Sequence, residues 1–182
     1  MKETDLSSFP KTLNAGAGKV KLLLWYFANA LVLNSYFLPI SIVKCWLLRL
    51  FGARIGKSVV IKPRVNIKFP WKLSIGDNTW IGEGVWIDNL DQVTIGKNCC
   101  LSQGSIIITG NHNYKKTTFD LITKPIVLED GVWLGAGSMV CPGVIAQNHA
   151  LLTMGSVATH GMLAYTVYKG NPAVEYKKRI IE

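Results

Sequence analysis

His112 is the residue of this chain best placed to do chemistry, and it lies in the stretch "IITGNHNY" over residues 107–114. An aliphatic run ends at Ile108, and polar residues then flank the histidine, as where a buried strand opens into a loop. A neutral imidazole can take a proton from a hydroxyl that acts as a nucleophile. The stretch therefore offers a candidate general base, although a lone histidine on a loop often has no catalytic role.

Aliphatic residues recur with a step of six along most of the chain. Three blocks of three are each separated by eight residues, and a gap of 21 residues precedes the last run. The repeated residues are Ile55, Ile61, Ile67, Ile75, Ile81, Ile87, Ile95, Leu101, Ile107, Leu128, Leu134, Val140, Ala146, Leu152 and Ala158. This step predicts an all-β solenoid, a parallel β-helix in which each hexad is a short strand plus a turn and three hexads make one triangular coil.

The hexads also suit the interior and corners of such a coil. In units such as "IGDNTW" and "LEDGVW" the leading aliphatic residue would point inward and stack on its copy one coil away, and the fifth residue is small or β-branched. His112 falls at the end of the hexad that Ile107 begins, where the 21-residue gap opens. Residues 113–125 are therefore predicted to project as an inserted loop with His112 at its root.

The two ends of the chain depart from the repeat. We expect an N-terminal tail over residues 1–19, an apolar helical cap over 20–52, the β-helix domain over 53–168, and a C-terminal tail with a short helix over 169–182.

The segment over residues 20–51 is apolar and is divided into two candidate helices by Pro39. Its apolar run over residues 22–38 has 17 residues, which is short of the roughly 20 that a bilayer span needs. Three interpretations stay open at this point. The helices cap the first coil, dock on a membrane surface, or span the membrane, and the first two are compatible.

The net charge of +9 is unevenly distributed. Residues 1–72 carry 12 Lys/Arg and 2 Asp/Glu, a net of +10, whereas residues 73–182 carry 8 and 9, a net of −1. Basic charge beside apolar residues favours contact with an anionic membrane surface. Nucleic acid is not expected as a partner, because no stripe of basic residues interleaved with aromatic residues is present.

The cysteines indicate a reducing compartment. Cys45, Cys99, Cys100 and Cys141 form no C-x-x-C motif, and an adjacent pair is a poor framework for disulfides. No small-residue cleavage site follows the apolar segment, so secretion is not expected. We therefore expect buried thiols in a cytoplasmic protein, with the inner face of the cytoplasmic membrane as a candidate location.

The hexads, the loop "TGNH", the stretch "VWLGAGSMVCPGV" and the closing "KGNPA" resemble the left-handed β-helix acyltransferases of the hexapeptide-repeat type. The resemblance covers roughly residues 20–180 and is strongest to colanic acid biosynthesis acetyltransferases, relatives of maltose and galactoside O-acetyltransferases. It implies left-handed winding, acetyl-CoA as acyl donor, and a homotrimer with active sites in clefts between subunits. No metal is expected.

The resemblance also implies roles for particular residues. His112 matches the general base, and the backbone N–H of Ala136, three residues after Trp133, matches the donor to the oxyanion. Acetyl-CoA contacts are implied for Trp133, Ala136, Met154, Gly155 and Thr159. The basic residues that follow "GNPA" would meet the phosphates of coenzyme A, and these are Lys177, Lys178 and Arg179. His160 stands where several relatives have a lysine, which puts one phosphate contact in doubt.

The acceptor side is less well marked, because Gly82 stands where the sugar-modifying relatives carry a substrate-binding asparagine. Asp88 and Asn89, in "IDNLDQ", lie about one coil before His112. We expect Asn89 to bind acceptor hydroxyls and Asp88 to orient the site, with Asn111 and Asn113 as further candidates. All four are also common turn residues.

These observations together predict an O-acetyltransferase that moves acetyl from acetyl-CoA to a sugar hydroxyl in surface polysaccharide synthesis. One alternative is an acyltransferase that acts on an amine, a nucleotide-linked amino sugar or a drug. A second is a non-catalytic trimeric scaffold, which would have no need of His112. A γ-type carbonic anhydrase is disfavoured, because His149 and His160 are 11 residues apart rather than closely spaced.

Overall fold

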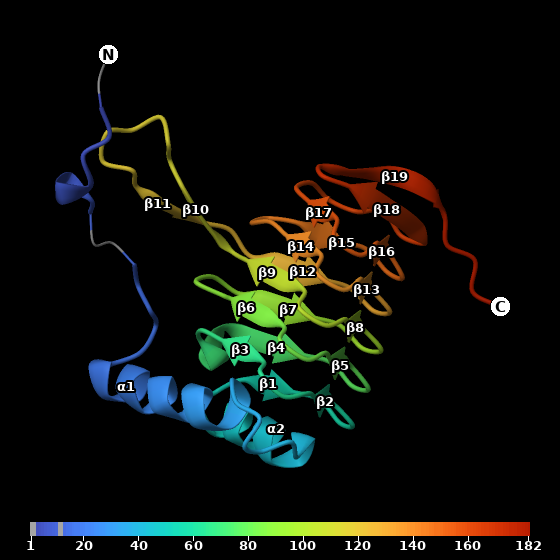
Figure 1. The fold of residues 1–182 in the computed structure, drawn as a ribbon, viewed down its shortest axis with the longest axis horizontal. Helices are drawn as coiled ribbons and strands as arrows, with labels where there is room; N and C mark the ends of the chain where they lie inside the picture. Colours follow the sequence, from blue (N-terminus) through green and yellow to red (C-terminus); the bar gives the residue numbers. More distant parts are fainter. Residues whose placement is uncertain (1–2, 11–12) are drawn as a thin grey trace.

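The computed structural model describes residues 3–10 and 13–182, which form a parallel β-solenoid closed at one end by helices (Figure 1). In this described part of the chain, strands from successive coils pair into three sheets that form the sides of the solenoid. The helical layer lies beneath the first coil, and later coils follow in sequence order toward the C-terminus. The predicted parallel solenoid is confirmed.

Each sheet takes one strand from each coil it spans. The first sheet contains β1 (Arg54–Ile55), β4 (Leu73–Ile75), β7 (Val93–Ile95), β12 (Ile126–Leu128) and β15 (Ile145–Ala146). The second contains β2 (Val60–Ile61), β5 (Trp80–Ile81), β8 (Cys100–Leu101), β13 (Trp133–Leu134), β16 (Leu151–Leu152), β18 (Thr166–Gly170) and β19 (Ala173–Lys178). The third contains β3 (Asn66–Ile67), β6 (Trp86–Asp88), β9 (Ile106–Ile108), β14 (Met139–Val140) and β17 (Val157–Ala158).

The strand register follows the six-residue repeat. Ile61, Ile81 and Leu101 are aligned in adjacent strands of the second sheet, and Leu134 and Leu152 continue the stack. All five side chains are buried. Stacking of the leading aliphatic residues therefore supplies the core, as the hexad pattern predicted.

Turns between strands place the fourth residue of most hexads in the left-handed region. Asn78 and Asn98 have φ of 57° and 54°, and Gly84 and Gly104 hold the equivalent place with φ of 67° and 64°. Asparagine and glycine tolerate this conformation better than other residues. Such turns let the chain change direction after only two or three strand residues.

The helical cap buries the start of the solenoid. It comprises α1 (Lys19–Ala28), the π-helical η2 (Asn29–Leu33) and α2 (Ser41–Leu50); shorter 3-10 turns are η1 (Leu6–Ser8) and η3 (Pro70–Lys72). The buried indole of Trp25 donates a 2.9 Å hydrogen bond to the carbonyl of Ile67 in the first coil. Leu33 and Leu48 are also fully buried against the coils. The capping role predicted for residues 20–52 thus has direct support from these contacts.

Lys44 is an unusual member of this cap because its side chain is fully buried. Its ammonium donates a 2.8 Å hydrogen bond to the carbonyl of Lys62, and burial lowers the pKa of Lys44.

None of the helices in the described part of the chain has the length and apolar character needed to cross a membrane.

The C-terminal segment differs from the helix predicted there. Strands β18 and β19 form an antiparallel hairpin that extends the second sheet beyond β16. The hairpin satisfies the backbone groups of the last coil, and β19 presents Glu175, Lys177 and Lys178 at the new edge. Charged residues on an edge strand discourage further strand pairing.

Candidate functional site

His112 lies on a hairpin that projects from the solenoid. Strand β10 (Gly110–His112) pairs antiparallel with β11 (Leu121–Thr123), and His112 is opposite Leu121. Figure 1 shows this hairpin extending away from the body of the solenoid beyond β9. We call residues 110–123 the arm. The insertion predicted over 113–125 is therefore real, but it contains a strand rather than only a loop.

The imidazole of His112 is held in a defined orientation. Its Nδ1 is 2.9 Å from the carbonyl oxygen of Phe119, and because a carbonyl can only accept, Nδ1 carries the hydrogen. The Phe119 ring stacks on the imidazole, with centroids 4.4 Å apart and an interplanar angle of 5°. In the neutral imidazole this leaves Nε2 with a free lone pair, which is the arrangement that a base requires.

The N-terminal segment packs against the arm rather than extending into solvent as a tail. The Asp5 backbone N–H donates to the carbonyl of Thr117 at 2.8 Å, and the Phe9 ring lies 5.7 Å from the imidazole of His112. Residues 3–10 therefore help to enclose His112. The sequence offered no signal for this contact, because the segment carries no repeat.

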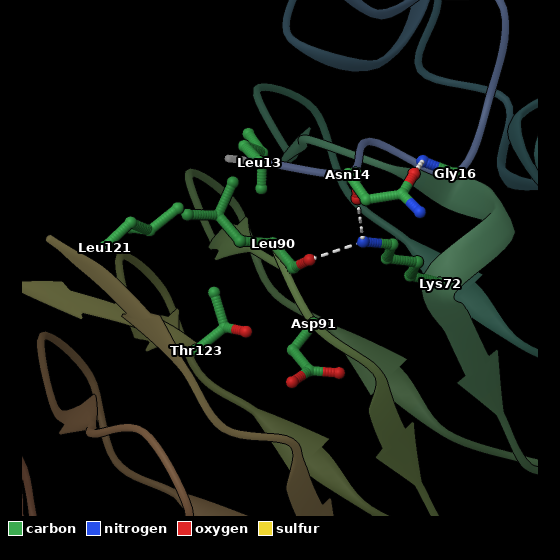
Figure 2. A pocket seen from close by; sticks show the side chains of 8 residues that line it. All are labelled: Leu13, Asn14, Gly16, Lys72, Leu90, Asp91, Leu121 and Thr123. Atoms are coloured by element: carbon green, nitrogen blue, oxygen red, sulfur yellow. Dashed lines mark hydrogen bonds between the residues drawn. The ribbon is translucent and has the colours of Figure 1, made fainter. Parts of the chain in front are cut away.

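A polar pocket of about 350 Å³ lies between the arm, the N-terminal segment and a corner of the solenoid (Figure 2). Leu121 and Thr123 line it from the arm, and Asp91 lines it from the corner. Lys72 is fixed at its edge, because its Nζ donates to the carbonyls of Asn14 at 2.9 Å and Leu90 at 2.6 Å. Leu121, the strand partner of His112, connects this pocket to the arm that carries the imidazole.

Asp91, Lys72 and Thr123 were not among the predicted site residues. Asp91 belongs to the same "IDNLDQ" unit as Asp88 and Asn89. The unit was correctly identified, but the sequence could not show which of its carboxylates and amides turn outward beside the arm.

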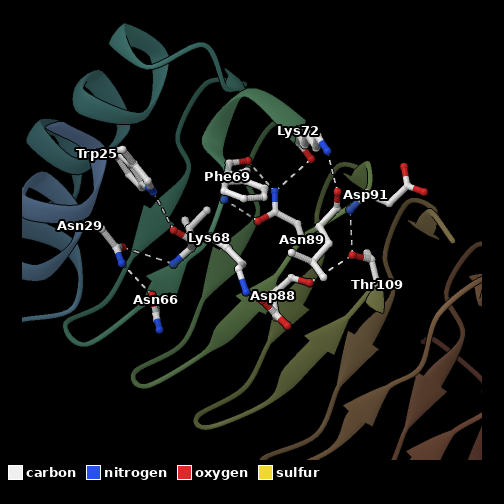
Figure 3. A network of polar contacts seen from close by, with 12 residues as sticks. Trp25, Asn29, Asn66, Lys68, Phe69, Lys72, Asp88, Asn89, Asp91 and Thr109 are labelled. Atoms are coloured by element: carbon white, nitrogen blue, oxygen red, sulfur yellow. Dashed lines mark hydrogen bonds and ion pairs between the residues drawn. The ribbon is translucent and has the colours of Figure 1, made fainter. Parts of the chain in front are cut away.

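The acceptor role predicted for Asn89 is wrong, because its side chain is fully buried and its polar atoms are used by the backbone (Figure 3). Its Oδ1 accepts from the Phe69 N–H at 2.9 Å, and its Nδ2 donates to the carbonyls of Phe69 at 2.6 Å and Lys72 at 3.1 Å. Asn89 therefore stabilises the corner around η3.

Asp88 also points elsewhere than the arm. Its Oδ1 lies 3.0 Å from the Nζ of Lys68, although the geometry of this ion pair leaves the oxygen without a directed hydrogen bond. Asp88 lines a groove between the cap and the third sheet, together with Trp86 and Asn66. In Figure 3 it lies among the residues of this junction, so an acceptor contact for Asp88 has no support from its position.

Asn111 and Asn113 flank His112 on the arm. The side-chain Oδ1 of Asn111 accepts from the His112 N–H at 2.8 Å, and the side-chain Oδ1 of Asn113 accepts from the Lys115 N–H at 3.1 Å. Their amide NH₂ groups are not used by these contacts, so acceptor binding by either residue stays a prediction.

A second, larger groove of about 680 Å³ lies on the outer face of the second sheet. Trp133, Ala136, Met154 and Lys177 are among the residues that line it. Four residues predicted to contact coenzyme A are thus brought together. The indole of Trp133 is held by a 2.9 Å hydrogen bond to Ser102 Oγ, and it remains partly exposed to the groove.

The backbone N–H of Ala136 is free in this groove. Within the described chain it donates no hydrogen bond, whereas the N–H groups of Gly135 and Gly137 donate to the carbonyls of Leu152 and Gln103. A free N–H beside an apolar wall can stabilise negative charge that develops on a bound carbonyl oxygen. Its position is consistent with the predicted role of Ala136.

The basic rim of the groove differs from the predicted one. Lys177 and Lys169 line it, and each ammonium lies over the ring of Tyr176, at 5.8 and 5.5 Å from the centroid. Lys169 and Tyr176 were missed, because the hairpin that presents them was predicted as a helix or tail.

Lys178 and Arg179 have other partners. Lys178 Nζ donates to Thr166 Oγ1 at 2.9 Å, and Arg179 Nη1 donates to the carbonyls of Gly131 and His149 at 3.0 Å each. These bonds attach the C-terminal segment to the solenoid, and phosphate contacts by Lys178 and Arg179 stay predictions.

Gly155 and Thr159 lie near the groove in sequence but do not line it. Gly155 N–H donates to the carbonyl of Ala136 at 2.9 Å and so supports the turn that carries the free N–H. Thr159 is exposed, with its hydroxyl 2.9 Å from His160 Nδ1. Their predicted contacts with coenzyme A stay predictions.

Cys45, Cys99 and Cys141 are poor candidates for an activated nucleophile. Burial raises the pKa of Cys99 to about 11, and burial also raises the pKa of Cys45 and Cys141. A neutral thiol is a poor nucleophile. Cys45 and Cys99 are buried as predicted, whereas Cys100 and Cys141 are only half-buried.

Among the residues that the structure describes, no three His, Cys, Asp or Glu side chains gather as a metal site would require.

The arm and the large groove lie on different sides of one chain. Figure 1 shows the arm, β10–β11, on one side of the solenoid and the groove-forming strands β13, β16, β18 and β19 on the other. The imidazole of His112 and the N–H of Ala136 are therefore not brought together within a single subunit.

A hexapeptide-repeat solenoid with an oriented imidazole on an inserted arm and an apolar, basic-rimmed groove defines the class of hexapeptide-repeat acyltransferases. The chain is 36% identical over 178 residues to the Escherichia coli K12 protein named "Putative colanic acid biosynthesis acetyltransferase WcaF", with 97% of each chain covered. The chain belongs to the acetyltransferase family that WcaF represents, as the sequence motifs indicated.

Other relatives agree with this assignment. Galactoside O-acetyltransferase of Escherichia coli K12 is 24% identical over 123 residues, which cover 66% of this chain and 61% of the relative. A hexapeptide-repeat acetyltransferase of Vibrio cholerae, solved with acetyl coenzyme A, shares the fold with a TM-score of 0.80 at 22% identity, covering 90% and 89% of the chains. No model of a protein family matches the chain.

Proposed function

We propose that the protein transfers acetyl from acetyl-CoA to a sugar hydroxyl in the synthesis of a surface polysaccharide, in the cytoplasm. The observation that carries the proposal is the orientation of His112, whose Nδ1–H is bound by the Phe119 carbonyl so that Nε2 is free to accept a proton. The name of the WcaF relative, which refers to colanic acid biosynthesis, supports the choice of a glycan acceptor.

In the proposed reaction, His112 Nε2 takes the proton of the acceptor hydroxyl as its oxygen attacks the thioester carbonyl. The Ala136 N–H donates a hydrogen bond to the oxyanion of the tetrahedral intermediate. When the intermediate collapses, the C–S bond breaks, the thiolate of coenzyme A leaves, and it receives the proton held by His112. The imidazole is thereby returned to its starting state.

The two halves of the site are proposed to meet between subunits of a cyclic trimer, with the arm of one subunit over the groove of the next. Such a head-to-tail contact joins two different surfaces. The chain offers two outward apolar surfaces: the second sheet carries exposed Trp80 and Trp133, and the third carries exposed Trp86. Burial of these side chains would favour association.

The acceptor is proposed to enter the polar pocket beside the arm. Asp91, Lys72 and Thr123 offer a carboxylate, an ammonium and a hydroxyl, and these groups can hydrogen-bond sugar hydroxyls. Coenzyme A would lie in the groove on the second sheet, with Lys169 and Lys177 toward its phosphates.

Acceptor-dependent release of free thiol from acetyl-CoA tests the enzymatic part of the proposal. We expect release to rise when a sugar with the correct hydroxyl is added from a panel of free, nucleotide-linked and lipid-linked acceptors. Stimulation by amine or drug acceptors alone would replace the sugar with another acceptor class. Coenzyme A binding without release on any acceptor would favour the scaffold alternative.

Complementation between two inactive subunits tests the shared site. We expect His112→Ala and the groove-filling Ala136→Trp each to be inactive as homotrimers. When the two are co-expressed with different tags and purified through both, each mixed cyclic trimer contains one cleft with both functional halves, so about one third of wild-type turnover should return. No recovery in mixed trimers would show that each site lies within one subunit.

A further inference from the structure

The outer face of the N-terminal cap is apolar although it faces solvent. In α1, the buried Trp25 points to the coils, whereas Leu24 and Phe27 on the opposite side are exposed, as is Leu31 in the following η2. A helix that is apolar on all sides is normally buried in a protein core or in a membrane. Capping the first coil uses only one side of α1, so the other side still requires an explanation.

Helix α2 repeats this arrangement. Cys45 and Leu48 are buried against the first coils, whereas Ile42 and Trp46 on the opposite side are exposed by 74% and 61%. Phe37, between the helices, is 89% exposed. We name the exposed side chains of Leu24, Phe27, Leu31, Phe37, Ile42 and Trp46 the apolar plate. It lies at the end of the solenoid where Figure 1 shows the helices.

A collar of positive charge surrounds the solenoid beside this plate. The first coil carries Arg54, Lys57, Lys62, Arg64 and Lys68, all exposed. No Asp or Glu occurs between residues 6 and 76. The charged side chains of the cap and the first coil are therefore all basic. Of the collar residues, Lys68 forms an ion pair, with Asp88.

We propose that the apolar plate docks on a bilayer that contains anionic phospholipid, with the basic collar at the level of the lipid phosphates. Apolar side chains that enter the interface and basic side chains that contact anionic headgroups act together in peripheral binding. A second copy of the chain suits this face poorly, because two plates in contact would bring two basic collars together.

This docking explains two features that capping alone leaves open. It accounts for six large apolar side chains that are exposed together on the helical cap instead of being scattered singly over the surface. It also accounts for the confinement of the excess positive charge to residues 1–72. Because the plate is at one end of the solenoid, the arm and the groove would remain open to soluble acetyl-CoA.

Flotation of the full chain with vesicles tests the proposal independently of acetyl transfer. We expect strong binding to vesicles of phosphatidylcholine with about 30% phosphatidylglycerol, and binding at least about tenfold weaker to phosphatidylcholine alone. Replacing Phe37, Ile42 and Trp46 together with serine should reduce binding to the anionic vesicles at least about tenfold. The matched control makes the same change to serine at Leu163, Ile180 and Ile181, which are exposed apolar residues outside the cap. This control variant should bind the vesicles as the wild type does.

Two further variants make the result decisive. Arg54→Gln, Lys57→Gln and Lys62→Gln together should weaken binding to anionic vesicles while binding to neutral vesicles stays the same. The single change Phe37→Ser, outside the helices, should weaken binding in the same direction if the triple serine variant unfolds. Equal binding to both vesicle types, or no effect of the plate variants, overturns the proposal. A plate variant that only reduces the assembly size would show that another copy covers the plate.

Discussion

Replacing His112 with alanine should lower the turnover number by about 10²–10⁴ while leaving the assembly folded. The half-buried imidazole stacks on the ring of Phe119 and lies near the ring of Phe9, and its Nδ1–H bond to the Phe119 carbonyl fixes which nitrogen is free. Because the imidazole is already oriented, little entropy is lost when it meets the acceptor hydroxyl. Removing it should therefore slow the chemical step and leave coenzyme A binding, which is proposed for the other groove, unchanged. The measurement is kcat and KM for thiol release with the stimulating acceptor.

Two comparisons make that result specific. Lys115→Ala changes an exposed residue on the same arm and should leave turnover near the wild-type value, which controls for damage to the arm. Free imidazole added to His112→Ala should restore part of the lost activity, because it supplies the missing base. Unchanged turnover in His112→Ala would contradict the base assignment, even if acetyl transfer itself is confirmed.

The solenoid could be predicted from the sequence because its repeat is local. Each hexad contains its own strand, turn and inward side chain. The stacking of Ile61, Ile81 and Leu101 could therefore be predicted from their spacing alone. The place of His112 at the root of an insertion followed from the same register. The family motifs were likewise sufficient to assign the class.

The failures have a common physical reason, which is that contacts outside the repeat have no period. Asn89 was expected to face an acceptor, but its amide instead satisfies the backbone of Phe69 and Lys72 in a corner that no hexad describes. The contact between Phe9 and His112 joins segments about a hundred residues apart, and no pattern in the sequence predicts it. The C-terminal hairpin was missed because its stability depends on the free edge of β16.

The groove shows the same division between local and non-local information. The resemblance to the hexapeptide-repeat acyltransferases implied that Trp133, Ala136 and Met154 share a site, and all three line the groove. Ala136 and Met154 are the third residues of hexads in adjacent coils. The residue types alone could not show which of the basic side chains face the groove. Lys177 and Lys178 are neighbours on one strand, and strand alternation sends them to opposite faces, where only Lys177 meets the groove.

Ala136→Pro should lower turnover by about 10²–10³, because it removes the backbone N–H proposed to bind the oxyanion. The substitution is well suited to this position. Ala136 is the third residue of its hexad, and Pro63 and Pro142 occupy the same place in two other hexads, so the turn accepts proline. Within the described chain the Ala136 N–H donates to nothing, so its loss breaks no bond of the folded subunit.

Bulk must be separated from the loss of the donor, and Ala136→Val provides the matched control. Valine adds a side chain of similar size to the groove but keeps the N–H, so it should weaken coenzyme A binding at most and retain most of kcat. A proline variant with kcat within about threefold of the valine variant would exclude the Ala136 N–H as the oxyanion donor. A fall confined to the proline variant, with an unchanged melting temperature, would instead place the developing negative charge at this turn. It would also establish that the groove on the second sheet holds the thioester end of the donor, which is the geometric condition for His112 to reach it from a neighbouring subunit.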